Sequence, residues 1–142
     1  MKQKKMIKKA VQAIPVRKGQ TYELHIDRLG TSGEGVGRHE NFTIFVPHAL
    51  PGETISAVIE DVKSSYARGR IKQILHESVD RVAPLCELYE QCGGCQLQHL
   101  SYEAQLHAKR AQVVEALTHI GKLPQIPVNE TLPADDPWNY RN

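Results

Sequence analysis

The sequence lacks the features that direct a protein to a membrane or through one. It has no hydrophobic run long enough to span a bilayer, and its lysine-rich start has no apolar core of the kind found in a secretory signal. The composition is otherwise that of an ordinary globular protein. A chain of 142 residues buries roughly two-thirds of its unfolded surface, enough for one domain or two small ones. We therefore expect a cytoplasmic protein.

Acidic residues are absent from the first eighteen positions, which hold seven Lys and Arg. The rest of the chain has eleven basic residues against sixteen acidic ones. A basic arm, residues 1–19, thus precedes an acidic body. Such an arm binds polyphosphate through salt-dependent contacts, or it is a solvated leader, and the charge pattern alone leaves both readings open.

Cysteine is scarce, and all three cysteines lie between Cys86 and Cys95, the last two in Cys92-Gly-Gly-Cys95. An odd number of thiols so close together favours a metal over a disulfide, and thiolates select zinc or the iron of a sulfide cluster. Both normally take four protein ligands. His99 would complete a Cys₃His zinc site; the other candidate is a cysteine that this chain lacks. A redox switch of Cys92 and Cys95 is less favoured, because such motifs usually open a helix in a βαβ unit.

Strict alternation of apolar and polar residues begins at Tyr22 and predicts short strands with turns, and no helices, between them. Inward faces are predicted for Tyr22, Leu24 and Ile26, for Ile55, Ala57 and Ile59, and for Ala67, Gly69 and Ile71. Five strands within residues 20–78 predict a small antiparallel β barrel of the oligonucleotide-binding kind.

Four glycines fall between Gly30 and Gly37. A phosphate-binding loop needs a helix after its glycines, and here a β-rich run, residues 42–46, follows. The glycines therefore predict a turn and a strand that another backbone approaches closely.

The fifth predicted strand places Tyr66, Arg68, Arg70 and Lys72 on one outward face. Three cations headed by an aromatic ring suit a nucleic-acid backbone and one stacked base, although most charged strand faces are simply solvated. Together with the basic arm, this row favours RNA binding.

The remaining chain, residues 79–142, is predicted to contain the cysteine segment and one helix, residues 101–120. Ser101 is the expected N-cap, and Gly121 and Pro124 mark the helix end. An apolar stripe on the helix is expected to pack on the cysteine segment. It consists of Leu106, Val113, Leu117 and Ile120. The proline-rich end is irregular or the first strand of something larger.

The order of these features resembles the bacterial 23S rRNA uracil-5-methyltransferases. The resemblance covers nearly the whole chain after residue 20 and rests on the motifs Gly33-Glu-Gly-Val-Gly-Arg38, Val46-Pro-His-Ala-Leu-Pro-Gly-Glu53, Tyr66-Ala-Arg-Gly-Arg70, Cys86-x₅-Cys92-Gly-Gly-Cys95-Gln-Leu-Gln-His99 and Tyr102-x-x-Gln105-x-x-x-Lys109.

The resemblance implies an RNA-binding TRAM barrel and a [4Fe–4S] cluster with Cys86, Cys92 and Cys95 as ligands and a fourth cysteine downstream. It implies RNA contacts by Arg68, Arg70 and Lys72, with Arg28 and Arg38 as further candidates. It also implies that the Rossmann-like domain that binds S-adenosylmethionine, the nucleophilic cysteine and the base are absent from this chain, which is then not catalytic alone. The alternative is a stand-alone RNA-binding adaptor with the Cys₃His zinc site.

Overall fold

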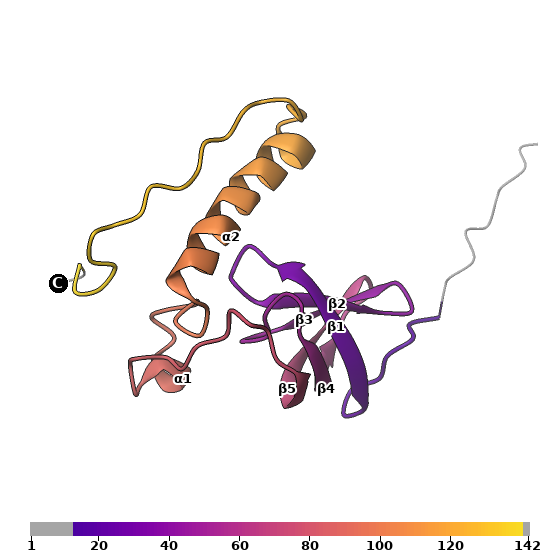
Figure 1. Ribbon diagram of the computed structural model, residues 1–142. Helices are drawn as coiled ribbons and strands as arrows, with labels where there is room; N and C mark the ends of the chain where they lie inside the picture. The colour runs from indigo at the N-terminus through magenta and orange to yellow at the C-terminus, as the bar shows by residue number, and fades with distance from the viewer. Residues whose placement is uncertain (1–12, 141–142) are drawn as a thin grey trace, which may run out of the picture.

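The computed structural model describes residues 13–140, which form a β barrel, a short cysteine-bearing segment, a helix and an extended tail (Figure 1). Most of the predicted basic arm, residues 1–12, lies outside the described residues. The strands are β1 (Thr21–Leu29), β2 (Gly35–His39), β3 (Phe42–Val46), β4 (Thr54–Val62) and β5 (Tyr66–His76). They are followed by α1 (Tyr89–Cys92), α2 (Tyr102–Glu115) and a π-helical turn, η1 (Ala116–Ile120). No helix in residues 13–140 is both long enough and apolar enough to cross a membrane.

The five strands close into a barrel in the order β1-β2-β3-β5-β4, which confirms the predicted five-stranded barrel. One pairing departs from the prediction of an antiparallel barrel, because β3 and β5 run parallel. The other four pairs are antiparallel. Direction cannot alternate all the way around a closed ring with an odd number of strands. One parallel pair is therefore unavoidable, and it falls where the chain crosses the barrel end between β3 and β4.

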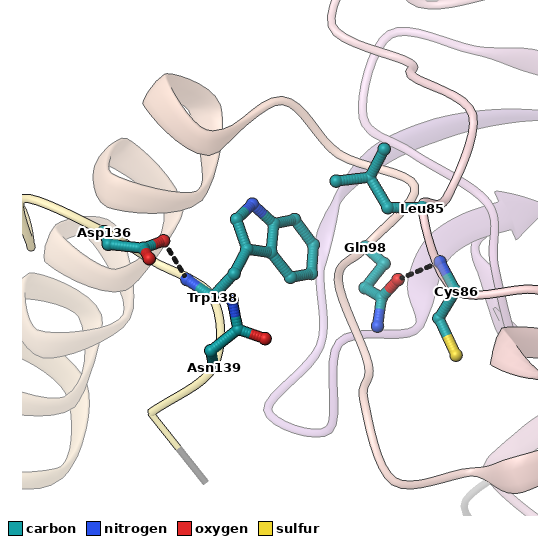
Figure 2. A pocket seen from close by; sticks show the side chains of 6 residues that line it. All are labelled: Leu85, Cys86, Gln98, Asp136, Trp138 and Asn139. Carbon is teal, nitrogen blue, oxygen red and sulfur yellow. Dashed lines mark hydrogen bonds between the residues drawn. The ribbon is translucent and has the colours of Figure 1, made fainter.

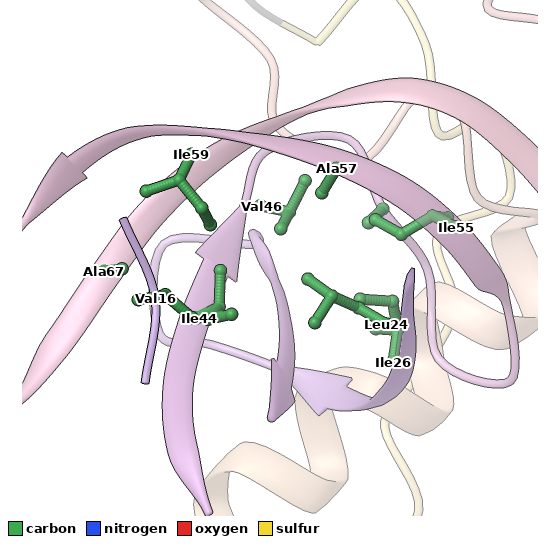
Figure 3. Packing of buried hydrophobic residues seen from close by; sticks show 10 residues of the cluster. Val16, Leu24, Ile26, Ile44, Val46, Ile55, Ala57, Ile59 and Ala67 are labelled. Atoms are coloured by element: carbon green, nitrogen blue, oxygen red, sulfur yellow. The ribbon is translucent and has the colours of Figure 1, made fainter. Parts of the chain in front are cut away.

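The barrel core consists of inward-facing aliphatic side chains (Figure 3). The predicted inward faces are confirmed on β1, β4 and β5, where Leu24, Ile55 and Ala67 are among the residues with no more than 1% exposure. Val16, which precedes β1, also packs in this core, so the folded unit begins before the first strand. The buried members of the cluster are Val16, Leu24, Ile26, Ile44, Val46, Ala49, Ile55, Ala57, Ile59 and Ala67.

Two glycines of β2 allow neighbouring backbone to approach closely. A Cβ on Gly35 would lie 2.7 Å from the Ala49 carbonyl oxygen, and one on Gly37 would lie 2.8 Å from the His25 carbonyl oxygen. The segment after the glycine-rich turn is a strand and not a helix. The glycines therefore serve barrel packing, as the sequence predicted.

Helix α2 begins as predicted, because the Ser101 side chain accepts a hydrogen bond from the Ala104 backbone N–H. Its packing differs from the prediction. Ala104 and Ala108 face a second apolar cluster of Leu29, Leu50 and Leu100, with Leu97 beside it. Two members of the predicted stripe, Val113 and Ile120, are 49% and 84% exposed. The prediction that the stripe packs on the cysteine segment is wrong, because the small alanine side chains let the helix approach the barrel through a different face.

The tail after η1 turns back along α2 on the side away from the barrel (Figure 1). It is held by bonds between backbone and side chains: Arg110 donates to the Val128 carbonyl, Thr131 donates to the Leu106 carbonyl, and the Ala134 N–H donates to the Tyr102 hydroxyl. On the opposite side, Gln112 donates to the Gly30 carbonyl of the barrel. Helix α2 thus lies between the barrel and the tail, and residues 123–134 form neither a helix nor a paired strand.

Candidate nucleic-acid interface and cysteine loop

Strand β5 presents the predicted row of polar side chains to solvent. Arg68, Arg70 and Lys72 are exposed and Tyr66 is half-buried, whereas Ala67 and Gly69 between them are buried. This alternation is the one expected for a strand with one face in the core. The row therefore exists as a surface.

The cations of the row are not equivalent. Arg70 pairs with Glu60 of the neighbouring strand, Nε to Oε1 at 3.2 Å, and both side chains are more than half exposed. Lys72 lies where β5 has one extra residue opposite β4, because the register passes from Ile71 opposite Ala57 to Gln73 opposite Ser56. Arg70 is thus paired with an acidic residue and Lys72 lies at an irregularity of the strand, whereas Arg68 is the cation placed beside the Tyr66 ring.

An aromatic pair stands next to Arg68. The rings of Phe45 and Tyr66 meet edge to face, with centroids 5.5 Å apart, and the Arg68 guanidinium carbon lies 6.0 Å from the Tyr66 ring centroid. The parallel register places Phe45 opposite Arg68. Phe45 did not emerge from the sequence as a functional candidate. Its outward position in the alternating run of residues 42–46 was visible, but its neighbour across the parallel pair was not.

Two further cations adjoin this aromatic pair. Arg38 is opposite Thr43, which in turn is opposite Tyr66, so these residues form a row across β2, β3 and β5. Lys63, in the turn before β5, bonds Asp61 at 2.9 Å, and this hydrogen bond together with the aspartate charge raises the pKa of Lys63. Lys63 was missed in the sequence, although its place three residues before Tyr66 was a signal. We call Phe45, Tyr66, Arg68, Arg38 and Lys63 the stacking surface.

Arg28, another predicted RNA contact, lies elsewhere. It is on β1, which neighbours neither β3 nor β5 in the barrel. It lines an open pocket between β1 and α2 that also contains the carboxylates of Asp27 and Glu115. The structure therefore gathers Arg38 with Tyr66 and Arg68, and leaves Arg28 apart.

The three cysteines lie on a short loop that includes α1. All three are exposed free thiols. Gly93 ends α1 in the left-handed conformation at φ +67°. A Cβ on Gly94 would lie 3.3 Å from the Cys92 sulfur, so the glycine leaves space beside that thiol. Exposed cysteine sulfurs beside glycines are the donors that a soft metal or an iron–sulfur cluster requires.

The three sulfurs have the chemistry of metal ligands, but they are not gathered at one point. Residues 13–140 contain no group of three or more His, Cys, Asp or Glu side chains placed to hold a metal ion. His99 joins no such group, is 2% exposed and has its Nδ1 2.6 Å from the Tyr89 hydroxyl. The expectation that His99 completes a Cys₃His site is therefore not supported. The thiols fit a metal by type and accessibility, and side-chain movement within the loop is needed to gather them.

Burial shifts the pKa values of His99 and Tyr89, the two rings that support this loop. Removal from water, together with the nearby positive charge of Arg81, lowers the pKa of His99 to about 4. Burial also raises the pKa of Tyr89 above its ordinary value. His99 is thus a neutral ring at neutral pH, and the His48 ring meets the Tyr89 ring and the His99 ring edge to face, each at a centroid distance of 5.5 Å.

A buried ion pair joins the barrel to the segment that leads to the cysteines. Glu53 is fully buried and accepts from Arg81 Nε at 2.6 Å and Nη2 at 2.9 Å, and from the Leu50 and Ser78 backbone N–H groups. Burial alone would raise the pKa of Glu53, but these hydrogen bonds outweigh it and hold the pKa below its ordinary value. Nothing in the sequence pattern paired these two residues.

Cys86 also borders an open pocket, where the Gln98 side chain accepts from the Cys86 backbone N–H at 3.2 Å and the Trp138 indole stands opposite Leu85 (Figure 2). The remaining lining residues are Asp136 and Asn139. The cysteine loop therefore faces the tail on one side.

Comparison with known proteins gives a family match for the barrel and relatives for most of the chain. The TRAM domain family matches residues 15–72. An uncharacterized RNA methyltransferase of Clostridium acetobutylicum is 48% identical over 131 residues, covering 91% of this chain, and one of Clostridium tetani is 46% identical over 129 residues, also covering 91%. This chain spans only 28% of the length of each of these relatives.

Among solved structures, the chain matches the tRNA (uracil-54, C5)-methyltransferase of Pyrococcus abyssi in complex with S-adenosyl-L-homocysteine. That match has 29% sequence identity and a TM-score of 0.40, over 67% of this chain and 21% of the other. Residues 15–72 are thus a TRAM domain, and the chain as a whole is similar to 28% of the length of clostridial proteins named RNA methyltransferases.

Proposed function

We propose that this chain is the RNA-binding and iron–sulfur portion of an S-adenosylmethionine-dependent 23S rRNA uracil-5-methyltransferase. The observation that carries the proposal is the TRAM barrel followed by the cysteine loop, in a chain that matches proteins named RNA methyltransferases. The proposal of uracil as the target base and of 23S rRNA as the substrate rests on the resemblance of the cysteine motif to that enzyme family. The proposal of a [4Fe–4S] cluster rests on the same resemblance.

The stacking surface supports binding of unpaired RNA. The pair Phe45 and Tyr66 offers ring surface on the outside of the barrel, and Arg68 lies beside it. Unpaired bases stack on aromatic rings and guanidinium planes, while nearby cations neutralise phosphate. A paired helix hides its base faces, so this surface favours single-stranded or loop RNA.

The cysteine loop supports a structural metal centre. When bound, the cluster would tie the loop together and add a rigid element beside the barrel. Cys86, Cys92 and Cys95 are its proposed ligands within this chain, with a fourth cysteine in the rest of the protein. As metal ligands, these thiolates are not free to attack a base, so methyl transfer belongs to groups outside this chain.

The test uses the full-length protein. With S-adenosylmethionine labelled in the methyl group and a 23S rRNA transcript, we expect 5-methyluridine in the nuclease-digested product, identified by mass spectrometry. The 142-residue chain alone is expected to bind the transcript and to transfer no methyl group. Label on a base other than uracil, or on tRNA with none on 23S rRNA, would contradict the proposed substrate.

A further inference from the structure

We infer that Tyr89 is the positioning residue of the cysteine loop: it ties together the two ends of the loop and so sets how Cys86, Cys92 and Cys95 approach one soft metal ion. This inference rests on the proposed metal-binding role of the loop. It concerns residues that are themselves not metal ligands.

Tyr89 is the one buried residue of α1, at 5% exposure, amid a loop whose cysteines are all exposed. Its backbone N–H donates to the Cys86 carbonyl at 3.1 Å. Its hydroxyl lies 2.8 Å from the Gln96 carbonyl, directly after Cys95. A single residue therefore connects the first cysteine of the motif, through its backbone N–H, with the residue after the last cysteine, through its hydroxyl.

The hydrogen-bond directions around the Tyr89 hydroxyl follow from its chemistry. A carbonyl only accepts, so the hydroxyl proton goes to Gln96, and we assign the proton between Tyr89 and His99 to Nδ1 of His99, which donates to the hydroxyl oxygen. The bond is 2.6 Å long and buried. It fixes the direction of the hydroxyl and leaves Nε2 of His99 as a buried nitrogen with no partner.

His99 is itself anchored to the rest of the fold. Its carbonyl accepts from the Val82 N–H at 3.0 Å, and Arg81 pairs with Leu100 in an isolated β-bridge. Arg81 also donates to the His48 carbonyl at 2.6 Å, and the His48 and Tyr89 rings meet edge to face. A continuous chain of contacts therefore runs from the barrel to the Tyr89 hydroxyl.

This arrangement limits the movement that metal binding requires. Tyr89 and Gln96 are held before any ion arrives, so the rearrangement is confined to the stretch between them and to the Cys86 side chain, and Gly93 gives that stretch backbone freedom. Closing a loop whose ends are already fixed avoids part of the entropy loss. Groups that hold ligands in place in this way typically change metal affinity by about 10- to 100-fold when removed.

The test is a cadmium titration of the reduced 142-residue chain under anaerobic conditions, with affinity measured by competition with a chelator. Cadmium binds thiolates, and the ultraviolet absorption of its thiolate bonds reports how many sulfurs it holds. We compare wild type with Tyr89→Phe, which keeps the ring and removes only the hydroxyl. Tyr140→Phe is the matched control, because Tyr140 is 81% exposed.

We expect Tyr89→Phe to bind cadmium about 10- to 100-fold more weakly and with a smaller thiolate absorption, while Tyr140→Phe matches wild type. Far-UV circular dichroism is expected to stay unchanged, since the barrel has its own core. His99→Gln, a second variant that leaves the Tyr89 hydroxyl in place, should shift affinity in the same direction by a smaller factor.

Equal cadmium affinity and absorption in Tyr89→Phe and wild type would overturn the inference. So would wild-type binding through fewer than three thiolates. The proposed function fails separately, by absence of iron and sulfide from the full-length protein, because the cadmium comparison needs neither iron nor activity.

Discussion

Arg81 Nε lies 2.6 Å from Glu53 Oε1, and this pair connects the start of β4 to the segment before the cysteines. The carboxylate is fully buried, and the Arg81 side chain is 16% exposed. The TRAM barrel and the cysteine segment are thereby joined through a charged contact as well as through the apolar cluster of Leu29, Leu50 and Leu100.

Arg81→Ala should destabilise the chain by about 3–5 kcal/mol, because it leaves the Glu53 carboxylate buried without its partner. The measurement is urea denaturation at neutral pH. Arg70→Ala is the matched control. It removes an arginine from the exposed pair with Glu60 and should change stability by about 0–1 kcal/mol. Similar losses of stability in the two variants would show that the buried Glu53 carboxylate does not need Arg81 as its partner.

Stability should fall as the pH is lowered from about 6.5 to about 4, because of His99. Burial depresses the pKa of His99 to about 4 in the folded state, so in this window the unfolded chain binds a proton that the folded chain does not. The shift corresponds to a loss of about 3 kcal/mol across the window. His99→Gln should flatten this part of the profile, measured by urea denaturation at a series of pH values.

His119→Gln is the control for that profile, since His119 is exposed on η1. Glu53 affects stability at lower pH than His99 does. Because its pKa is lowered in the folded state, the stability that the Glu53 carboxylate contributes is lost only as the pH falls below the ordinary pKa of glutamate. An unchanged slope between pH 6.5 and 4 in His99→Gln would contradict the account of His99.

Gly37→Ala should destabilise the barrel by about 1–3 kcal/mol, because the added methyl group would lie 2.8 Å from the His25 carbonyl oxygen. Thermal or urea unfolding measures the loss. Under conditions where the variant is folded, its RNA affinity should equal that of wild type, as expected for a packing glycine. Ser32→Ala, in the turn before β2 and exposed, should stay within about 0.5 kcal/mol of wild type. A drop in RNA affinity without a loss of stability would favour a phosphate-binding loop.

Full-length protein purified without oxygen should contain iron and acid-labile sulfide, and Cys92→Ser should lose both. His99→Gln should retain them, because His99 is bonded to Tyr89 and joins no metal-holding group. Metal and sulfide analysis with a visible spectrum measures both variants. Stoichiometric zinc that disappears in His99→Gln would instead establish the Cys₃His site.

The sequence predicted the features that depend on local pattern. Alternation placed Leu24, Ile55 and Ala67 in the core, and the capping preference of serine placed the start of α2 at Ser101. Contacts between residues far apart in sequence were not predicted. Phe45 meets Tyr66 only because β3 and β5 pair in parallel, and Glu53 meets Arg81 across 28 positions. The exposed stripe of α2 was misplaced because hydrophobic spacing does not reveal that alanines face the barrel.

The salt dependence of RNA binding by this chain tests the proposed RNA interface, with single-stranded RNA as ligand and fluorescence anisotropy as readout. Arg68→Ala should weaken binding and reduce the slope of log affinity against log salt by about 0.7 to 1, the value of one phosphate contact. Tyr66→Leu and Phe45→Leu should each weaken binding by about 1–3 kcal/mol with an unchanged slope, because stacking releases no ions. Lys109→Ala, on the exposed face of α2, should leave affinity unchanged. Wild-type affinity and slope in all three surface variants would contradict the proposed RNA interface.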